Sequence, residues 1–355
     1  MFKYNFIENL DLNRIKEIRE ILRKGGVGIF PTDTVYGIVS FLYSKEGREK
    51  IFKIKKRDRR KPLILFPETI KNIEKYAKLN SLSKKAIDKF LPGKLTLIVE
   101  KRNIPIGNKN SVGIRLPCDP LILLLIKQIG LPLATTSANI SGEPPLIDIK
   151  INKKKEIFKE VDFIISKGKL PGTPSTILDI FSRPPRILRK GEVALKYIEE
   201  VLGILCKVEE LKILFVCTGN SCRSPMAKAI ADKTFYGLNV SIESCGIFTQ
   251  EGNYISKNTK IVLNSKGLQF NHKTKPIKEE LVRWADIIFV MEKQQKEIIK
   301  RMYNNSYKIE LLPKYIGEKE IEDPFNYDLN KYFEVYGKIE KAIQEIRERI
   351  KKRLI

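Results

Sequence analysis

The stretch CTGNSCRS, residues 217–224, decides the fold of the second half of this chain. It follows the apolar run ILFV at 213–216 and precedes a segment of helical character at 225–231, so the expected order is strand, loop, helix. In such an arrangement the N–H groups of the loop and the N-terminus of the helix converge on one anion. Gly219 permits a tight turn and Asn220 tolerates a left-handed backbone, which favours a phosphate-binding loop.

The ends of this loop carry the groups that phosphoryl transfer needs. Arg223 presents a planar fork that matches two phosphate oxygens. The helix dipole and the loop N–H groups are expected to lower the pKa of Cys217, which gives a thiolate that attacks phosphorus, and Ser224 is placed to hydrogen-bond that thiolate. The open alternative is a buried cysteine that ends a core strand beside a solvated arginine. The other residues assigned to the phosphate site are Thr218, Gly219, Asn220, Ser221 and Cys222.

The residues that follow fit a doubly wound parallel α/β sheet. We expect strands at 240–243 and 287–291, and helices at 258–266, 293–302 and 329–353. Asp323 and Pro324 lie between the last two helices. A carboxylic acid is needed to protonate the leaving group and then to activate water. An Asp before a Pro is otherwise common in turns.

From residue 212 onward the chain resembles the low-molecular-weight protein phosphatases. The resemblance implies that Cys217 is the nucleophile, that Arg223 binds phosphate and that Asp323 is the acid. Tyrosine-directed members usually carry a bulky aliphatic residue at the position of Ser221 and paired tyrosines after Asp-Pro, whereas the protein-arginine phosphatase branch is similar to CTGNTCRSP with DPF. Because Ser221 is small and Phe325 follows Asp-Pro, we expect a phosphoarginine substrate. A phosphotyrosine phosphatase that tolerates both residues stays open.

The cysteines limit the chemistry further. The chain has five, which are too few and too irregularly spaced for a disulfide framework. The thioredoxin-coupled arsenate reductases of this fold need downstream cysteines to relay a disulfide, and only Cys245 follows Cys222, so that activity is disfavoured. Cys222 could form a reversible disulfide with Cys217, or it could simply pack the loop.

Composition favours a two-domain protein with anionic partners. A chain of 355 residues can bury two cores, and Lys+Arg number 67 against 42 for Asp+Glu. That excess favours nucleotides or tRNA as partners, although lysines scattered through nearly every helix also fit a lysine-rich proteome. The single histidine, His272, has no companion ligands, so we expect no metal site and assign it no catalytic role. The longest apolar stretch is 121–126 and the N-terminal segment is acidic, so we expect a cytoplasmic protein.

The first half of the chain places polar motifs among apolar runs. In order they are PTDTVYG (31–37), KKRDRRK (55–61), VGIRLP (112–117), ATTSANISG (134–142), PSTILDI (174–180) and ILRKGE (187–192). The second has six cations in seven residues, which is typical of a solvated or nucleic-acid-facing patch. Arg115 interrupts an apolar run, where a guanidinium needs an anion from the protein or from a substrate. The motif ATTSANISG offers small hydroxyl and amide residues that can approach phosphates closely.

Together with PGKLTLIV at 92–99, these motifs resemble the threonylcarbamoyl-adenylate synthase family over residues 8–205. The family makes an activated carbamoyl-threonine from threonine, bicarbonate and ATP, releases pyrophosphate, and supplies threonylcarbamoyladenosine formation at tRNA position 37. The resemblance implies that threonine is bound near Thr32, Arg115 and Ser175. It implies that ATP is bound by Lys55, Arg57, Lys61, Ser137, Asn139, Ser141 and Arg189.

This synthesis needs no covalent enzyme intermediate, so positioning and cationic charge must carry catalysis. Mg²⁺ is expected to bridge the ATP phosphates with few protein ligands, and the phosphatase is expected to need no cofactor. The resemblance also implies a twisted open α/β sheet with a basic groove. We therefore expect a bifunctional enzyme with a synthase domain at 1–207 and a phosphatase domain at 211–355.

Partners and alternatives complete the expectation. The substrates would be ATP, L-threonine, bicarbonate and a phosphoprotein, and the partners would be tRNA-modification enzymes. A non-catalytic RNA-binding module in the first domain is the alternative to synthesis. Direct tRNA binding, coupling of the two activities and the oligomeric state are left open.

Overall fold

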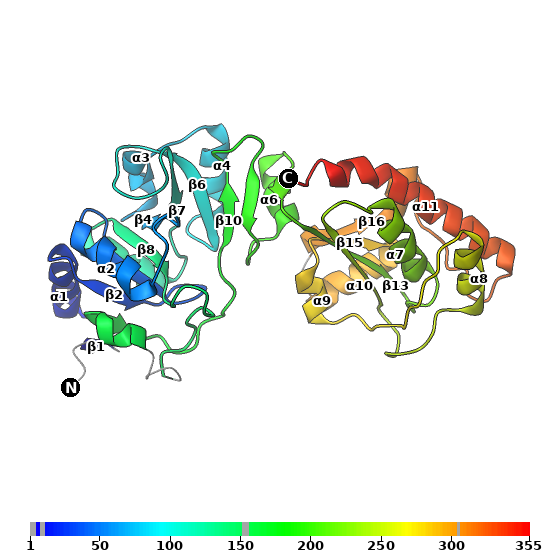
Figure 1. The fold of residues 1–355 in the computed structure, drawn as a ribbon, viewed down its shortest axis with the longest axis horizontal. Coiled ribbons are helices and arrows are strands. Elements are labelled where there is room, and N and C mark those ends of the chain that lie inside the picture. The colour runs from blue at the N-terminus through cyan, green and yellow to red at the C-terminus, as the bar shows by residue number, and fades with distance from the viewer. Residues whose placement is uncertain (1–4, 8–10, 151–155, 304–305) are drawn as a thin grey trace. The chain divides into compact units, whose positions relative to one another are not determined.

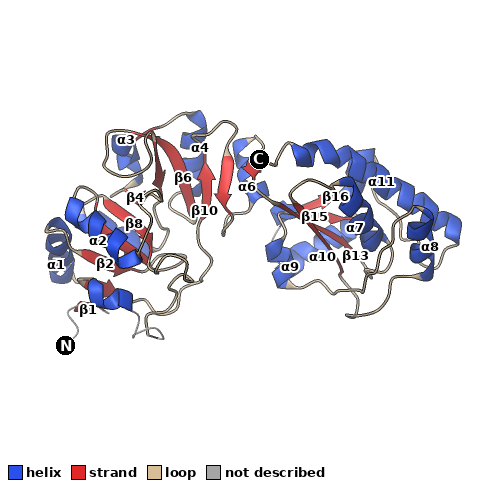
Figure 2. Ribbon diagram, in the orientation of Figure 1, coloured by secondary structure: helices blue, strands red, loops and turns tan. Residues whose placement is uncertain are grey.

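The computed structural model describes residues 5–7, 11–150, 156–303 and 306–355. The chain folds as two compact units. Unit 1 comprises Met1–Val193 with Val201–Gly203, and unit 2 comprises Ala194–Glu200 with Ile204–Ile355. Both units combine a β-sheet with helices (Figure 1, Figure 2). The predicted domain boundary at 207–211 stays a prediction.

Unit 1 is built on a mixed sheet of parallel and antiparallel neighbours. In sheet order its strands are β1 (Asn5–Ile7), β9 (Phe163–Ile165), β2 (Val27–Phe30), β3 (Gly37–Phe41), β8 (Leu133–Ser137), β4 (Ile64–Phe66), β7 (Ser111–Ile114), β6 (Leu95–Lys101), β10 (Thr176–Asp179) and β11 (Arg186–Arg189). The short strand β5 (Ala77–Lys78) pairs with β6. Strands β3 and β8 are antiparallel, and Gly37 lies opposite Ser137. This register brings PTDTVYG beside the start of SANISG.

The helices of unit 1 pack on an apolar core. They are α1 (Leu12–Arg23), α2 (Lys45–Lys55), α3 (Ile73–Tyr76), α4 (Ser81–Phe90) and α5 (Pro120–Ile129), with short 3-10 helices at Ile70–Asn72 and Glu156–Glu160. Helix α5 begins where the Asp119 carboxylate caps its first N–H groups, and it ends at Gly130, whose φ is 61°. Ile18 of α1 and Ile122 of α5 lie in the same buried cluster. This core fixes the strands whose ends carry the polar motifs.

Unit 2 is a doubly wound parallel sheet, which confirms the predicted fold. Its strand order is β14 (Val240–Gly246), β13 (Leu211–Cys217), β15 (Ile287–Val290) and β16 (Ile309–Leu311), with parallel neighbours throughout. Helices α7, α8 and α11 lie on one side of the sheet, and α9 and α10 lie on the other (Figure 1). The helices are α7 (Arg223–Thr234), α8 (Lys257–Ser265), α9 (Glu279–Trp284), α10 (Lys293–Tyr303) and α11 (Leu329–Lys351), with short elements η3 (Ser306–Lys308), η4 (Leu312–Ile316) and β12 (Lys207–Val208).

The predicted elements of unit 2 are present with small shifts at their ends. The most informative shift is at α7, which starts at Arg223 rather than at residue 225. The last two residues of CTGNSCRS therefore form the first turn of the helix. None of the helices that the structure describes combines the length and the apolar character needed to cross a bilayer.

Helix α6 (Leu195–Leu202) packs through side chains that belong to unit 2. The carboxylate of Glu199 accepts two hydrogen bonds from Arg353, both at 3.1 Å, and both side chains are buried. Lys196 forms an ion pair with Glu310 at 2.7 Å. Breaking a buried ion pair of this kind is strongly destabilising, because it leaves one charge without a partner. Part of the helix that follows the synthase-like motifs is thus a structural element of unit 2.

Candidate active sites

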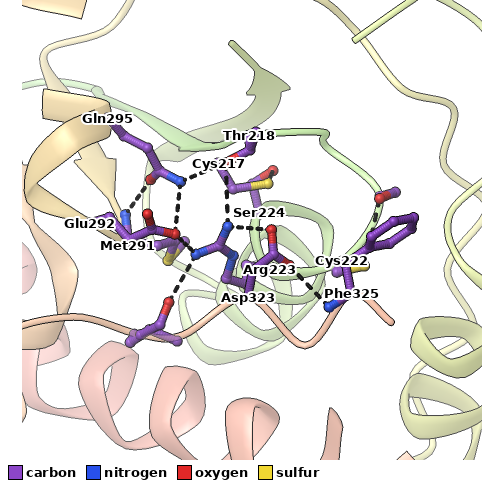
Figure 3. Close-up of polar contacts among 12 residues, drawn as sticks. Cys217, Thr218, Cys222, Arg223, Ser224, Met291, Glu292, Gln295, Asp323 and Phe325 are labelled. Atoms are coloured by element: carbon purple, nitrogen blue, oxygen red, sulfur yellow. Dashed lines mark hydrogen bonds and ion pairs between the residues drawn. The ribbon is translucent and has the colours of Figure 1, made fainter. Parts of the chain in front are cut away.

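The phosphate loop joins β13 to α7, so Cys217 is the last strand residue and Arg223 is the first helical residue (Figure 3). The Cys217 Sγ lies 3.0 Å from the Ser224 Oγ. It also accepts a hydrogen bond from the Asn220 N–H at 3.3 Å. The contact between Cys217 and Ser224 that the sequence predicted is therefore present.

Asn220 fixes the shape of this loop from within. It is fully buried, and its φ of 53° confirms the predicted left-handed conformation. Its Nδ2 donates to Ser224 Oγ at 2.9 Å and to Ser244 Oγ at 3.1 Å. Its Oδ1 accepts from the Lys275 N–H at 2.9 Å and lies 3.0 Å from His272 Nε2. Because an amide oxygen can only accept, the proton of the His272 ring lies on Nε2.

Arg223 is the buried cation of the loop. Its Nη1 donates to Glu292 Oε1 and to the carbonyl oxygen of Ile321 at 2.9 Å. Its Nη2 donates to Asp323 Oδ2 at 2.5 Å and to Thr218 Oγ1 at 3.4 Å (Figure 3). Its Nε is buried and has no hydrogen-bond partner among the residues that the structure describes. A buried donor without a partner is costly, which indicates that this edge of the guanidinium faces a ligand.

The predicted low pKa of Cys217 is wrong for this arrangement. Burial raises the pKa of the Cys217 thiol, and this effect outweighs the positive charge of Arg223 and the hydrogen bonds to sulfur, which lower it. The two carboxylates Glu292 and Asp323 offset the charge of Arg223. The groups that favour the thiolate against burial are Arg223, Ser224 and Asn220.

The remaining loop residues lie at the edge of the site. Ser221 is partly buried, and its Oγ lies 3.5 Å from the Sγ of Cys222. Cys222 is a buried free thiol, also 3.5 Å from Tyr332 Oη, and its disulfide with the nucleophile stays a hypothesis. Phe325 is 57% exposed, and its N–H donates to Asp323 Oδ1 at 3.2 Å. The exposed ring thus lies next to the predicted acid.

A cleft of about 530 Å³ in unit 1 collects most of the residues predicted to bind threonine and ATP. The predicted residues that line it are Thr32, Arg57, Lys61, Arg115, Ser137, Asn139, Ser175 and Arg189. Arg60 and Asn108 also line it, and sequence reasoning did not single them out. Its described lining residues include no carboxylate. A concave surface with cations and hydroxyl groups favours an anionic ligand.

Two arginines that line this cleft, Arg115 and Arg189, have protein partners. Arg115 is buried and donates to Asp33 and, at 3.0 Å, to Thr34 Oγ1. Arg189 donates to the carbonyl oxygen of Ser175 at 3.0 Å and to its Oγ at 3.1 Å. Burial lowers the pKa of both guanidinium groups, yet arginine keeps its charge in proteins. The anion that Arg115 needs is therefore supplied at least in part by Asp33.

Two residues predicted to bind ATP are not among the residues that line the cleft. Lys55 is buried, and its Nζ donates to the carbonyl oxygens of Ser137 and Asn139 and, at 3.2 Å, to Asn139 Oδ1. Burial, assisted by Arg57, lowers the pKa of Lys55 to about 7. Ser141 is exposed, and its N–H donates to the carbonyl oxygen of Lys55 at 2.9 Å. Lys55 thus supports the loop that lines the cleft, and contacts of either residue with ATP stay predictions.

Two family models match the chain, one on each unit. The model for Sua5, YciO and YrdC proteins, described as telomere recombination, matches residues 20–191. The model for low molecular weight phosphotyrosine protein phosphatases matches residues 212–354. A candidate threonylcarbamoyl-AMP synthase of Methanocaldococcus jannaschii is 40% identical over 199 residues, which are 54% of this chain and 93% of that relative. A protein-arginine-phosphatase of Bacillus subtilis is 32% identical over 149 residues, 40% of this chain and 98% of that relative.

The chain belongs to both families. A solved structure of Pyrococcus abyssi Sua5 in complex with L-threonine has a TM-score of 0.54 at 20% identity, covering 96% of this chain and 98% of that one, and it supports the fold. Unit 1 is accordingly a domain of the Sua5, YciO and YrdC family, and unit 2 is a low-molecular-weight phosphatase domain. The predicted fusion of the two families is confirmed.

Sequence reasoning missed several residues that support the phosphatase loop. Gly246 ends β14 directly beneath the loop, where a Cβ would lie 2.9 Å from the backbone nitrogen of Asn220. Glu292 and Gln295 follow β15, and Gln295 Nε2 donates to Thr218 Oγ1 at 3.2 Å. Their position directly after an apolar strand could have indicated them, because polar side chains at the carboxyl ends of parallel strands lie at one edge of the sheet. His272 carried no such signal, since it lies outside the strands.

Proposed function

We propose that this chain is a bifunctional enzyme. Its first domain makes L-threonylcarbamoyladenylate from threonine, bicarbonate and ATP, and its second domain removes phosphate from arginine residues of proteins. For the synthase, the carrying observation is the cationic cleft, which is lined by Arg57, Arg60, Lys61, Arg115 and Arg189. For the phosphatase, it is the buried Arg223 Nε without a partner, in the loop that begins with Cys217.

The synthase reaction requires an amino acid and a nucleotide to meet in one cleft. The threonine nitrogen adds to the carbon of bicarbonate with loss of water, and the new carboxylate attacks the α-phosphorus of ATP, which expels pyrophosphate. Thr32 and Ser175 offer hydroxyl groups to threonine near the charge of Arg115. Arg57 and Lys61, which line the same cleft, supply charge to the phosphates. This division uses position and charge rather than a nucleophile on the enzyme.

Mg²⁺ enters this proposal as part of the MgATP substrate. No carboxylate is among the described residues that line the cleft. Within the described ranges, no group of three or more His, Cys, Asp or Glu residues could hold a metal ion. Hydroxyl and amide oxygens fit a Mg²⁺ that keeps several waters and is held chiefly by phosphates.

Pyrophosphate release from ATP tests the synthase. Release should require both threonine and bicarbonate, and it should fall when Arg57 or Lys61 is replaced by alanine. Release that ignores threonine would overturn the proposal. Binding of structured RNA without any release would establish the RNA-module alternative. Because the product is a reactive adenylate, an enzyme that passes the carbamoyl-threonine group to tRNA is the expected partner.

In the phosphatase reaction the Cys217 sulfur attacks phosphorus and the bond from phosphorus to the substrate nitrogen breaks. Asp323 gives its proton to the departing guanidine, and it then takes a proton from the water that releases phosphate from the cysteine. Loop N–H groups and Arg223 bind the phosphoryl oxygens. Ser224 stabilises the thiolate through the 3.0 Å contact. Replacing Asp323 by asparagine should therefore slow poor leaving groups more than good ones.

Phosphoarginine is the proposed substrate because Ser221 leaves room and a hydroxyl beside the phosphate loop. The B. subtilis relative named above is a protein-arginine-phosphatase, which supports this choice. Peptides with phosphoarginine and phosphotyrosine should be compared by kcat/KM. Ser221→Ile should shift the ratio toward phosphotyrosine by about tenfold or more, because the polar substrate group loses its partner. Ser221→Thr, which keeps the hydroxyl, is the matched control. A native preference for phosphotyrosine would overturn the assignment.

A further inference from the structure

Glu292 is a second carboxylate at Arg223 that the chemistry above does not use. Its Oε1 accepts a hydrogen bond from Arg223 Nη1, on the side of the guanidinium away from Asp323 (Figure 3). Its side chain is 23% exposed, compared with 39% for Asp323. Arg223 is thus held between two carboxylates, of which one is better shielded from water.

The surroundings of Glu292 make it the more rigid partner. It lies between β15 and α10, where Gln295 Nε2 lies 3.4 Å from its Oε1. Gln295 is itself buried, and both ends of its amide are hydrogen-bonded. Its Oε1 accepts from the Met291 N–H at 2.9 Å, and its Nε2 donates to Thr218 Oγ1. Neither carboxylate lies in a helix or strand: Glu292 is in the two-residue turn before α10, and Asp323 is in the longer loop before α11. The less exposed group, in contact with a buried side chain, can define a position that a more exposed loop residue cannot.

Because the guanidinium is planar, the contact of Nη1 with Glu292 determines which way the rest of the Arg223 fork points. Nε and Nη2 form one edge of the fork, and that edge can bind two oxygens of one phosphoryl group. Nη1 points away from this edge and is taken by Glu292 and by the carbonyl oxygen of Ile321. Of the two nitrogens on the edge, Nε has no described partner, and Nη2 donates to Asp323 and, at 3.4 Å, to Thr218 Oγ1. Among the described residues, the acid is therefore the only charged group on the edge suited to phosphate.

We propose that Glu292 is the positioning residue for Arg223, and that Asp323 leaves Nη2 when a phosphoryl group binds. Glu292 keeps Nη1, so Nε and Nη2 stay directed at the phosphoryl oxygens. Asp323, once exchanged for the phosphoryl group, is released beside the leaving group that it must protonate. The inference rests on the proposed phosphatase function. It adds that binding of the phosphoryl group by Arg223 and release of Asp323 from Nη2 occur in the same step.

Glu292→Gln gives a test in which two effects have opposite signs. Removing a negative charge beside the loop would by itself strengthen the binding of an anion. Losing the charged partner of Nη1 would instead let the guanidinium turn, and phosphate binding would weaken. The proposal requires the second effect to dominate. The expected loss is about tenfold, the usual effect of one charge-assisted hydrogen bond.

The measurement is protection of Cys217 from alkylation by iodoacetamide, with inorganic phosphate as the probe and the full-length protein as the sample. The half-protecting phosphate concentration should rise in Glu292→Gln. Glu297→Gln is the matched control, because Glu297 lies on α10, the helix that directly follows Glu292, pairs with Lys300 at 3.0 Å and makes no described contact with the loop. A half-protecting concentration that falls or stays constant in Glu292→Gln would overturn the proposal.

Asp323→Asn provides the second arm. Because this change removes the group that competes for Nη2, phosphate should protect Cys217 at a lower concentration, although turnover falls. Weaker protection in Asp323→Asn would show that Asp323 supports Arg223 rather than exchanging with phosphate, and would overturn the exchange. Thermal unfolding followed by the fluorescence of Trp284, the single tryptophan, reports that each variant is folded. If phosphate fails to protect the native protein, the proposed phosphatase function itself is wrong, and this outcome is distinct from the others.

Discussion

The phosphate loop and the synthase cleft are two proposed anion-binding sites that this chain builds in opposite ways. The loop takes its nucleophile, its arginine and its N–H groups from eight consecutive residues that run from the end of β13 into the first turn of α7. The cleft takes its side chains from segments spread from Thr32 to Arg189. Strand pairing, such as that of Gly37 with Ser137, brings these segments together. One site is thus defined by local backbone geometry, and the other by tertiary structure.

The buried arginines of the two sites show what the difference means for function. Arg115 pairs with Asp33, and both side chains are 7% exposed, so neither can readily exchange its partner for water or substrate. Arg223 pairs with Asp323, which is 39% exposed. The first pair is part of the framework of the cleft. The second is a contact that a ligand can replace.

The largest expected effect separates the two sites completely. Cys217→Ser should lower phosphatase turnover by about a thousandfold or more, because a serine hydroxyl does not supply the thiolate. Pyrophosphate release by the synthase domain should be unchanged in the same sample. A folded variant that loses both activities would contradict the comparison, since it would mean that the sites are not independent.

An intermediate effect tests whether Arg115 belongs to the framework. Arg115→Ala leaves the buried carboxylate of Asp33 without its cationic partner, with only the N–H and thiol of Cys118 still donating to it, so the free energy of unfolding of the synthase domain should fall by about 3 to 5 kcal/mol. Arg57→Ala is the matched control. Its guanidinium donates to the carbonyl oxygens of Lys61 and Pro62, so its removal strands no carboxylate. Urea unfolding followed by circular dichroism measures both. Equal stability losses in the two variants would remove the distinction drawn between the arginines.

The smallest expected effect concerns pH and the phosphatase domain alone. Burial lowers the pKa of His272 from 6.5 to about 4. Between these values the unfolded chain binds more protons than the folded chain, so acidification favours unfolding. Because of His272, the free energy of unfolding of the phosphatase domain should fall by about 2 kcal/mol as the pH drops from about 7 to about 5.

His272→Gln should remove this part of the pH dependence while keeping a donor for Asn220. Urea unfolding followed by Trp284 fluorescence measures it, because that residue lies in unit 2. The difference between the native protein and the variant isolates His272 from the carboxylates that titrate in the same range. Identical pH profiles would show that His272 is not the group responsible.

The same comparison explains how much could be predicted from the sequence. The parallel sheet of unit 2 followed from apolar runs alternating with helical segments, and the contact between Cys217 and Ser224 followed from a short spacing. Most of the predicted synthase residues lie in one cleft. They could be predicted because the order of the motifs matches the family. Local geometry and family patterns were therefore sufficient for these features.

The failures have physical causes. KKRDRRK does not reveal which cation turns inward, because that depends on Lys56, whose φ of 49° ends α2 and reverses the chain after Lys55. The raised pKa of Cys217 results from its burial, which the sequence alone does not show. Glu292 was missed because its contact with Arg223, 69 residues earlier in the sequence, forms only in the folded protein. Charge balance in a buried site is a tertiary property.

Helix α6 has a consequence for how the two enzymes could ever be separated. Glu199 lies upstream of the first strand of the phosphatase, yet its buried partner Arg353 lies 154 residues later. A phosphatase excised at residue 207 would lose that carboxylate and strand the guanidinium. A protease cut just after the helix would divide the polypeptide but leave the contact intact. The segment that joins the two domains is therefore not a freely exchangeable linker. A transplanted phosphatase domain must include the part of α6 that carries Glu199, although this helix precedes the first strand of that domain.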